Sequence, residues 1–141
     1  MVTVLKLGSL PQFVRFGIVG CMGFVVDSGV LYASIYLLGT GFYTGRVLSY
    51  ISAATATWYL NRVITFSQNN SNNLGAEWAR FVACNAVGGG VNYGVYVAYL
   101  HFATHSVFTP VIGVALGSCA SLCVNYWLSR QLVFKKTMAA S

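Results

Sequence analysis

Four long stretches of this 141-residue chain are almost free of charge, and they constrain its fold more than any other feature. They run roughly over residues 16–38, 45–66, 79–100 and 108–128. Each approaches the ~20 residues that an α-helix needs to cross a hydrocarbon layer of ~30 Å. Within lipid, only helices and closed barrels satisfy every backbone polar group. We therefore expect an all-α integral membrane protein with four transmembrane helices.

The composition argues against a water-soluble alternative. Charged residues make up 7 % of the chain and apolar residues 57 %, whereas an ordinary soluble domain is about 25 % charged. A net charge of +6 would suggest a nucleic-acid partner in a soluble protein. Here the cations border the apolar stretches, where they act as topology determinants, and we expect no nucleic-acid partner. The length predicts a single domain over residues 1–141.

The connections between the stretches divide the chain into two helical hairpins. Short turns at residues 39–44 and 101–107 join the first helix to the second and the third to the fourth. The middle segment SQNNSNNLGAE, at residues 67–77, is rich in Asn and predicts a solvated link. Four antiparallel helices joined in this way predict a compact bundle.

The positive charges border the predicted spans unevenly. Seven of the eight lie at the N-terminus, the middle link or the C-terminus, and only Arg46 lies on the opposite side. Because Lys and Arg accumulate on the cytoplasmic side, we expect both termini and the link in the cytoplasm. The first fifteen residues show no pattern of a cleavable signal peptide. The seven cations are Lys6, Arg15, Arg62, Arg80, Arg130, Lys135 and Lys136.

The two predicted hairpins resemble each other. Aligning RFGIVGCMGFVVDSGVLYASI (15–35) with RFVACNAVGGGVNYGVYVAYL (80–100) gives identity in seven of the 21 columns, and Asp27 falls opposite Asn92. The second helices end alike, in LNRVITF (60–66) and LSRQLVF (128–134). A tandem repeat of a two-helix unit predicts halves that are related by an axis along the membrane normal.

Asp27 is the most informative single residue. It lies eleven residues past Phe16, or ~16 Å along a helix, close to the expected bilayer centre. A charged Asp at that depth costs roughly 2.5–3.5 kcal/mol on insertion scales. A neutral Asp that is hydrogen-bonded between helices is one interpretation. A carboxylate that binds substrate or a proton is the other.

Each predicted helix carries a stripe of small and polar residues at helical spacing. Small residues let helices approach closely, and Asn, Ser and Thr bond across the interface. Tight packing alone explains the glycines. Because every stripe also includes an Asn or Asp, we expect a polar central crevice. The stripes are Phe16, Gly20, Gly23, Asp27, Val30 and Ser34; Ser49, Ala53, Thr57 and Asn61; Asn85, Gly88, Asn92 and Tyr96; and Gly113, Gly117, Ser121 and Asn125.

Four arginines are predicted to form a cytoplasmic ring. Arg15 and Arg80 open the first and third helices, while Arg62 and Arg130 close the second and fourth. Snorkelling to the headgroups is one interpretation of this ring. A clamp on a lipid phosphate is the other, because guanidinium binds phosphate in a bidentate manner. Arg46, alone on the far side, is expected either to receive the same phosphate after transfer or to pair with Asp27.

Signals for other chemistry are weak. His101 and His105 have i, i+4 spacing but no further ligands, so we expect no metal site. The four cysteines lie inside apolar segments and follow no zinc or redox spacing. The chain has one Asp and one Glu, with no Gly-rich phosphate loop and no nucleophile–base pair. We therefore expect neither an enzyme nor a cofactor.

Several short motifs resemble those of the GtrA-like family of four-helix membrane proteins. RFGIVG (15–20) resembles the family's RFxxVG, Asp27 stands where members commonly carry an acidic residue, and NRVITF (61–66) resembles NRxxTF. The last helix keeps Arg130 and Phe134, but Ser129 stands where an Asn is usual. The resemblance covers residues from about Gln12 to Lys136.

This resemblance implies a role in cell-surface polysaccharide synthesis at the bacterial cytoplasmic membrane. Such proteins are thought to move a polyprenyl-phosphate-linked sugar across the membrane, beside a glycosyltransferase that loads the sugar on the cytoplasmic face. Buried Asn and Asp would then bond sugar hydroxyls, basic groups would hold phosphate, and the polyprenyl chain would stay in lipid. The candidate substrate-binding residues are Asp27, Asn61, Asn85, Asn92, Asn125, Arg15, Arg46, Arg62, Arg80 and Arg130.

Two other functions stay open at this point. A non-transporting membrane anchor would recruit the glycosyltransferase without moving lipid. A small proton-coupled exporter would suit the length and the single membrane carboxylate, but such exporters pair antiparallel protomers and the charge distribution is lopsided. Because four helices of this size barely enclose a path, we also expect a homo-oligomer.

Overall fold

The structure is a computed structural model that describes residues 7–68, 71–104, 106 and 108–134. The regular structure throughout these ranges is helical, without a β-strand, and the all-α prediction is confirmed. Four residues that carry predictions lie outside the described ranges: Lys6, His105, Lys135 and Lys136.

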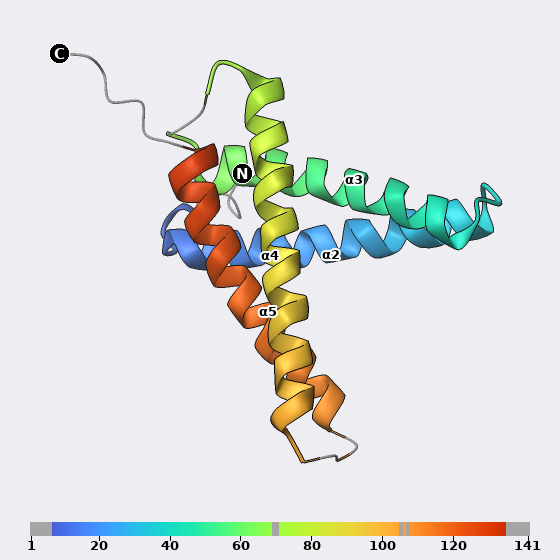
Figure 1. The fold of residues 1–141 in the computed structure, drawn as a ribbon. Helices are drawn as coiled ribbons and strands as arrows, with labels where there is room; N and C mark the ends of the chain where they lie inside the picture. Colours follow the sequence, from blue (N-terminus) through green and yellow to red (C-terminus); the bar gives the residue numbers. More distant parts are fainter. Residues whose placement is uncertain (1–6, 69–70, 105, 107, 135–141) are drawn as a thin grey trace. The chain divides into compact units, whose positions relative to one another are not determined.

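Four long helices carry the architecture of the described chain (Figure 1). They are α2 (Gln12–Tyr36), α3 (Phe42–Leu60), α4 (Leu74–Phe102) and α5 (Thr109–Leu128). Helix α3 continues into a π-helical turn, η1 (Asn61–Thr65), and α5 continues into a second one, η2 (Ser129–Val133). The four predicted stretches therefore correspond to the four helices.

The polar link is shorter than the sequence predicted, because α4 begins at Leu74 rather than near residue 79. Before the helix, the backbone N–H of Asn73 donates to the Ser71 hydroxyl at 3.1 Å, which orients the chain toward the first turn. Glu77 lies in that first turn, where a carboxylate interacts favourably with the helix dipole. Its side chain is 0 % exposed, so the prediction of a solvated link is wrong at Glu77.

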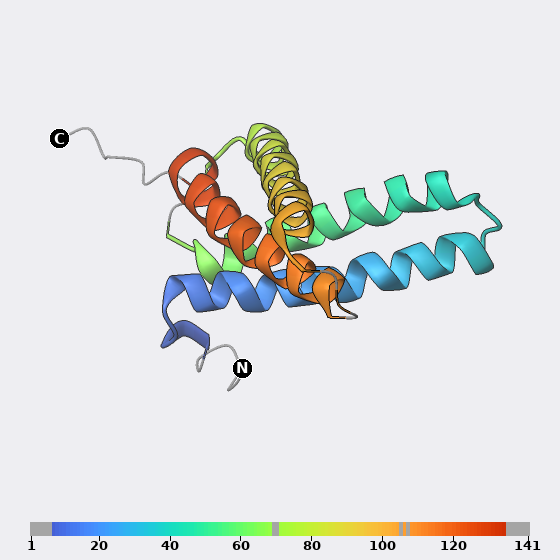
Figure 2. The ribbon, with the colours of Figure 1, turned by 60° about the horizontal axis from the view of Figure 1, so that its bottom comes forward.

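The described chain separates into two compact units, each built on one pair of helices. The first holds residues up to Leu74 together with Phe134, and the second is Gly75–Val133. Helices α2 and α3 run antiparallel and side by side, as do α4 and α5 (Figures 1 and 2). We call α2, α3 and η1 the first hairpin, and α4, α5 and η2 the second hairpin.

The first hairpin is fixed at both ends. At its open end, Phe66 meets the edge of Phe16, with ring centroids 6.2 Å apart, and stacks on Phe134 at 4.6 Å. All three rings are buried. At the turn, Gly39 adopts φ +66°, a conformation that favours glycine, and the Thr40 hydroxyl donates to the Ser34 carbonyl at 2.8 Å.

Large apolar side chains lie exposed along the helices, among them Phe24, Val25, Tyr93 and Phe102. Such patches in water would be a liability for aggregation. Within the described ranges, two helical segments are long and apolar enough to cross a membrane, Gln12–Tyr36 and Ile112–Val133. One belongs to each hairpin, and their exposed apolar faces suit contact with acyl chains.

Candidate functional site

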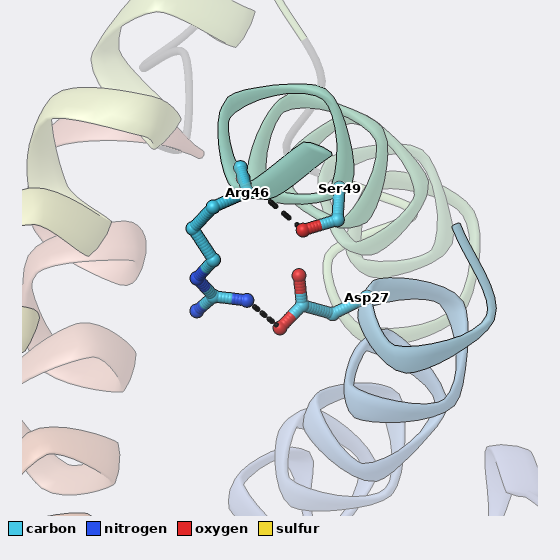
Figure 3. A network of polar contacts seen from close by, with 3 residues as sticks. All are labelled: Asp27, Arg46 and Ser49. Atoms are coloured by element: carbon cyan, nitrogen blue, oxygen red, sulfur yellow. Dashed lines mark hydrogen bonds and ion pairs between the residues drawn. The ribbon is translucent and has the colours of Figure 1, made fainter. Parts of the chain in front are cut away.

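The first hairpin holds an ion pair between Asp27 on α2 and Arg46, which lies near the start of α3 (Figure 3). The Nη1 group of Arg46 donates to Oδ2 of Asp27 at 2.6 Å. Of the two interpretations of Arg46, pairing with Asp27 is the one that the structure shows. An opposite charge reduces the cost of placing a carboxylate deep in a membrane-spanning helix.

The geometry of this pair leaves polar capacity unused on both partners. Oδ1 of Asp27 is buried and has no hydrogen-bond partner. The Asp27 side chain is 21 % exposed, whereas that of Arg46 is 57 % exposed. Ser49, one turn along α3, points toward the carboxylate (Figure 3), but its hydroxyl donates to the carbonyl of Arg46 at 3.1 Å. The protein thus covers most of the Asp27 side chain and leaves more than half of the Arg46 side chain exposed.

The second hairpin has amides and hydroxyls where the first has charges. The Asn92 amide donates to the Ser118 hydroxyl at 3.4 Å, and the Asn125 amide donates to Ser121 at 3.3 Å. A Cβ on Gly117 would lie 2.6 Å from the Asn92 carbonyl oxygen, so this glycine lets the helices approach. The Asn125 Oδ1 atom is buried without a partner. These neutral groups suit hydrogen bonds to hydroxyls.

Two glycines that the repeat alignment pairs make matching contacts in their own hairpins. A Cβ on Gly23 would collide with the Thr57 methyl group, and a Cβ on Gly88 would collide with the Asn125 amide. Both glycines therefore accept a side chain from the partner helix. The predicted packing of helix against helix is therefore confirmed at Gly23 and Gly88, whereas Gly20 of the first stripe is exposed and has nothing within 4 Å of its Cβ position.

Two of the four arginines in the predicted ring bind backbone in the first hairpin. Arg15 donates from Nη1 to the carbonyl of Ile64 at 2.6 Å, and Arg62 donates to the carbonyl of Ser71 at 3.1 Å. Gln12 donates to the carbonyl of Thr65 at 3.2 Å. Carbonyls at a helix end lack intrahelical donors, so Arg15 and Gln12 satisfy the end of η1 and hold it against α2. Arg62, by contrast, ties η1 to the link at Ser71. Arg15 and Arg62 are therefore structural groups as well as candidates for phosphate.

The remaining candidate residues are described within their own hairpins. Asn61 is buried, and its Oδ1 accepts from the Thr65 hydroxyl at 2.8 Å within η1. Asn85 donates to the carbonyl of Phe81 on its own helix. Arg80 and Arg130 are exposed. That the two hairpins enclose a polar crevice between them stays a prediction.

Sequence reasoning missed the role of Gln12, which joins α2 to the end of η1. The sequence does contain a signal for this role. Gln12 is a polar residue at the start of an otherwise apolar helix, and Arg15 follows it three residues later. Ser49 was expected only as a stripe residue, and its position beside Asp27 depends on the tertiary contact of α2 with α3 (Figure 3). In the described part of the chain, no group of three or more His, Cys, Asp and Glu residues could hold a metal ion.

The sequence of the chain matches one known family. The family model described as GtrA/DPMS, transmembrane domain, matches residues 15–134. No curated protein matches the chain. The matched range runs from the first arginine of α2 to the phenylalanine that follows η2, and it includes both hairpins.

Proposed function

Because this chain belongs to the GtrA/DPMS transmembrane-domain family, it is a membrane protein, and we propose that it flips a polyprenyl-phosphate-linked sugar across the cytoplasmic membrane. The family supports a role in processes that involve lipid-linked sugars. The observation that carries the flipping proposal is the Asp27–Arg46 pair, a charged contact maintained inside a membrane-spanning hairpin with one buried oxygen unpaired. Intramembrane ionisable residues that face a partner helix commonly mark transport sites.

The proposed topology has four membrane spans in two tandem repeats, with both termini and the link in the cytoplasm. The uneven distribution of Lys and Arg supports this orientation. The repeat is supported by the equivalent glycine contacts at Gly23 and Gly88 and by the π-helical turns that end both hairpins. In this topology the hairpin turns, and the end of α3 nearest Arg46, lie toward the outer face.

In the proposed cycle a glycosyltransferase attaches the sugar on the cytoplasmic face. The exposed Arg80 and Arg130 attract the phosphate. The sugar hydroxyls bond to the amides of Asn85, Asn92, Asn125 and Asn61, while the polyprenyl chain stays in lipid. The chain carries out no covalent step and acts as a homo-oligomer. Asp27 is the candidate proton carrier if flipping is gradient-driven.

The test is reconstitution of the purified protein in liposomes that contain a labelled polyprenyl-phosphate sugar. We expect protein-dependent exposure of the sugar on the opposite leaflet, lost in Asp27→Asn and in Arg62→Ala although both variants insert. Tyr93→Phe, which changes an exposed aromatic residue of α4, serves as the matched control and should flip normally. Absence of any protein-dependent exposure with the unaltered chain would contradict the proposal.

One observation favours a second function, that of a membrane anchor for the glycosyltransferase. Arg15 and Arg62 hold backbone carbonyls, a structural task that needs no substrate. An anchor predicts normal glycosylation in cells that carry Asp27→Asn. It also predicts loss of glycosylation when Arg80 and Arg130 on the exposed surface are both changed to Ser.

A further inference from the structure

The Asp27–Arg46 contact has the form of an interaction that can be exchanged rather than of a permanent brace. A guanidinium and a carboxylate form their strongest contact through two parallel N–H···O bonds. Here a single contact of 2.6 Å joins Nη1 to Oδ2, and Oδ1 remains buried without a donor. A buried acceptor without a partner costs free energy that a closed, bidentate pair would recover. The carboxylate is therefore held but not fully satisfied.

Arg46 keeps most of its binding capacity for another anion. A guanidinium has five N–H donors in a rigid fork, and one of its nitrogens contacts Asp27. More than half of the side chain is exposed. A phosphodiester offers two anionic oxygens with a spacing that suits the fork, as a carboxylate does. A phosphodiester that engages both arms of the fork needs the Nη1 group that Asp27 holds, and two anions on one guanidinium repel each other, so Asp27 and the phosphodiester compete for Arg46.

The position of Arg46 along α3 makes lipid phosphate accessible to it. Arg46 is the fifth residue of α3, so it lies ~6 Å along the axis from the helix start at Phe42. A long basic side chain near a helix end can extend to the headgroup level while its stem stays in apolar surroundings. Asp27, by contrast, lies fifteen residues from the start of α2 and nine from its end, well inside the helix.

We propose that Arg46 is a binding site for the phosphodiester anion of a lipid, and that Asp27 is a built-in competitor that occupies Arg46 when no such lipid is bound. The identity of this lipid as a sugar carrier rests on the proposed function, whereas the exchange itself does not. When the phosphodiester takes Arg46, the Asp27 carboxylate keeps Ser49 beside it (Figure 3). The Ser49 hydroxyl can then turn from the Arg46 carbonyl to Asp27, which supplies the donor that the carboxylate loses.

This competition reverses the expected effect of one substitution on lipid affinity. If Asp27 bound the lipid directly, Asp27→Asn would weaken binding. Because Asp27 instead neutralises the charge of Arg46 and engages its Nη1 group, Asp27→Asn should strengthen binding of the lipid. Release then becomes slow, since no carboxylate remains to recapture the guanidinium, and tight binding accompanies loss of flipping.

The experiment measures equilibrium binding to the full chain in maltoside micelles, which contain no phosphate. The probes are farnesyl-phosphate-glucose, phosphatidylglycerol and inorganic phosphate, and bound lipid is quantified by native mass spectrometry with calorimetric titration. We expect Asp27→Asn to bind farnesyl-phosphate-glucose about 10-fold more tightly, which is about 1.4 kcal/mol. Arg46→Gln should bind it at least about 10-fold more weakly, and the double variant should behave like Arg46→Gln. Asp27→Glu, which keeps the competing charge, and Tyr93→Phe should bind as the unaltered chain does.

Two outcomes would overturn the inference. One is unchanged or weaker binding of both lipid probes by an Asp27→Asn variant that elutes as folded protein. The other is tighter binding of inorganic phosphate alone by Asp27→Asn, which would show that the site does not bind a lipid. Binding is measured without transport, so the two proposals can fail separately. If Asp27→Asn binds the lipid more tightly but the unaltered chain does not flip it, the exchange site is retained and the flippase is rejected.

Discussion

The two hairpins use one packing plan with different polar chemistry. In both, a glycine on the first helix accepts a side chain from the second, and the second helix ends in a π-helical turn. The first hairpin then places Asp27 against Arg46, while the second places Asn92 against Ser118. Packing therefore does not require charge, because the second hairpin achieves the same approach with neutral groups. The charged pair in the first hairpin calls for a functional explanation.

The largest expected effect follows from removing the cation of the first hairpin. Arg46→Gln leaves the Asp27 carboxylate without its partner, and we expect a loss of about 3 kcal/mol in unfolding free energy. Unfolding in mixed micelles measures it. Asp27→Asn/Arg46→Gln should recover most of the loss, because the double variant has a neutral interface like that of the second hairpin. A double variant as unstable as Arg46→Gln would show that Arg46 stabilises through packing rather than charge.

The second hairpin can be given the charge of the first. When LNRVITF and LSRQLVF are aligned, Arg46 falls opposite Val114, an exposed residue of α5. We expect Asn92→Asp to destabilise the protein by about 2 kcal/mol, because the new carboxylate has no cation. Adding Val114→Arg should restore stability in the same unfolding assay. Failure of the rescue would mean that the two hairpins differ in geometry and not only in side-chain type.

Close approach of the helices should also be sensitive to single methyl groups. In Gly117→Ala the new Cβ meets the backbone of Asn92, which cannot rotate away, and we expect a loss of about 1.5 kcal/mol. Gly94→Ala is the matched control, because nothing lies within 4 Å of its Cβ position. Thermal unfolding of the two variants should separate them, and equal melting temperatures would argue against tight packing at Gly117.

The smallest effect concerns the π-helical turns. Ser129 is 1 % exposed, and its hydroxyl has no partner, whereas its counterpart Asn61 accepts a hydrogen bond from Thr65. We expect Ser129→Ala to be neutral or stabilising by under about 1 kcal/mol, and Asn61→Ala to destabilise by about 1 kcal/mol. Chemical unfolding of the two variants in parallel would detect this difference in the sign of the change in stability. Two losses of equal size would mean that the Ser129 hydroxyl is satisfied.

The sequence predicted the helices well, because apolar length and turn composition determine them locally. It misplaced the start of α4, since the Asn-rich segment hid that Glu77 already lies in the first helical turn. It identified Asp27 from the cost of burying a charge, and pairing with Asp27 was one of the two roles that it offered for Arg46. It did not predict that Arg15 and Gln12 hold η1, because those contacts depend on how α2 and α3 meet. Periodicity specifies a face, whereas the atoms that meet across it depend on tertiary packing.

The first hairpin is tied to its own backbone at both extremities, by Arg15 and Gln12 at one end and by Thr40 at the other. Helices that are fixed in this way do not need to separate for Arg46 to change partners. The exchange then requires only rotation about side-chain bonds, which takes picoseconds to nanoseconds, and not the microseconds to milliseconds of collective helix motion. Anion capture at this point would be fast compared with any step that carries a headgroup through the bilayer.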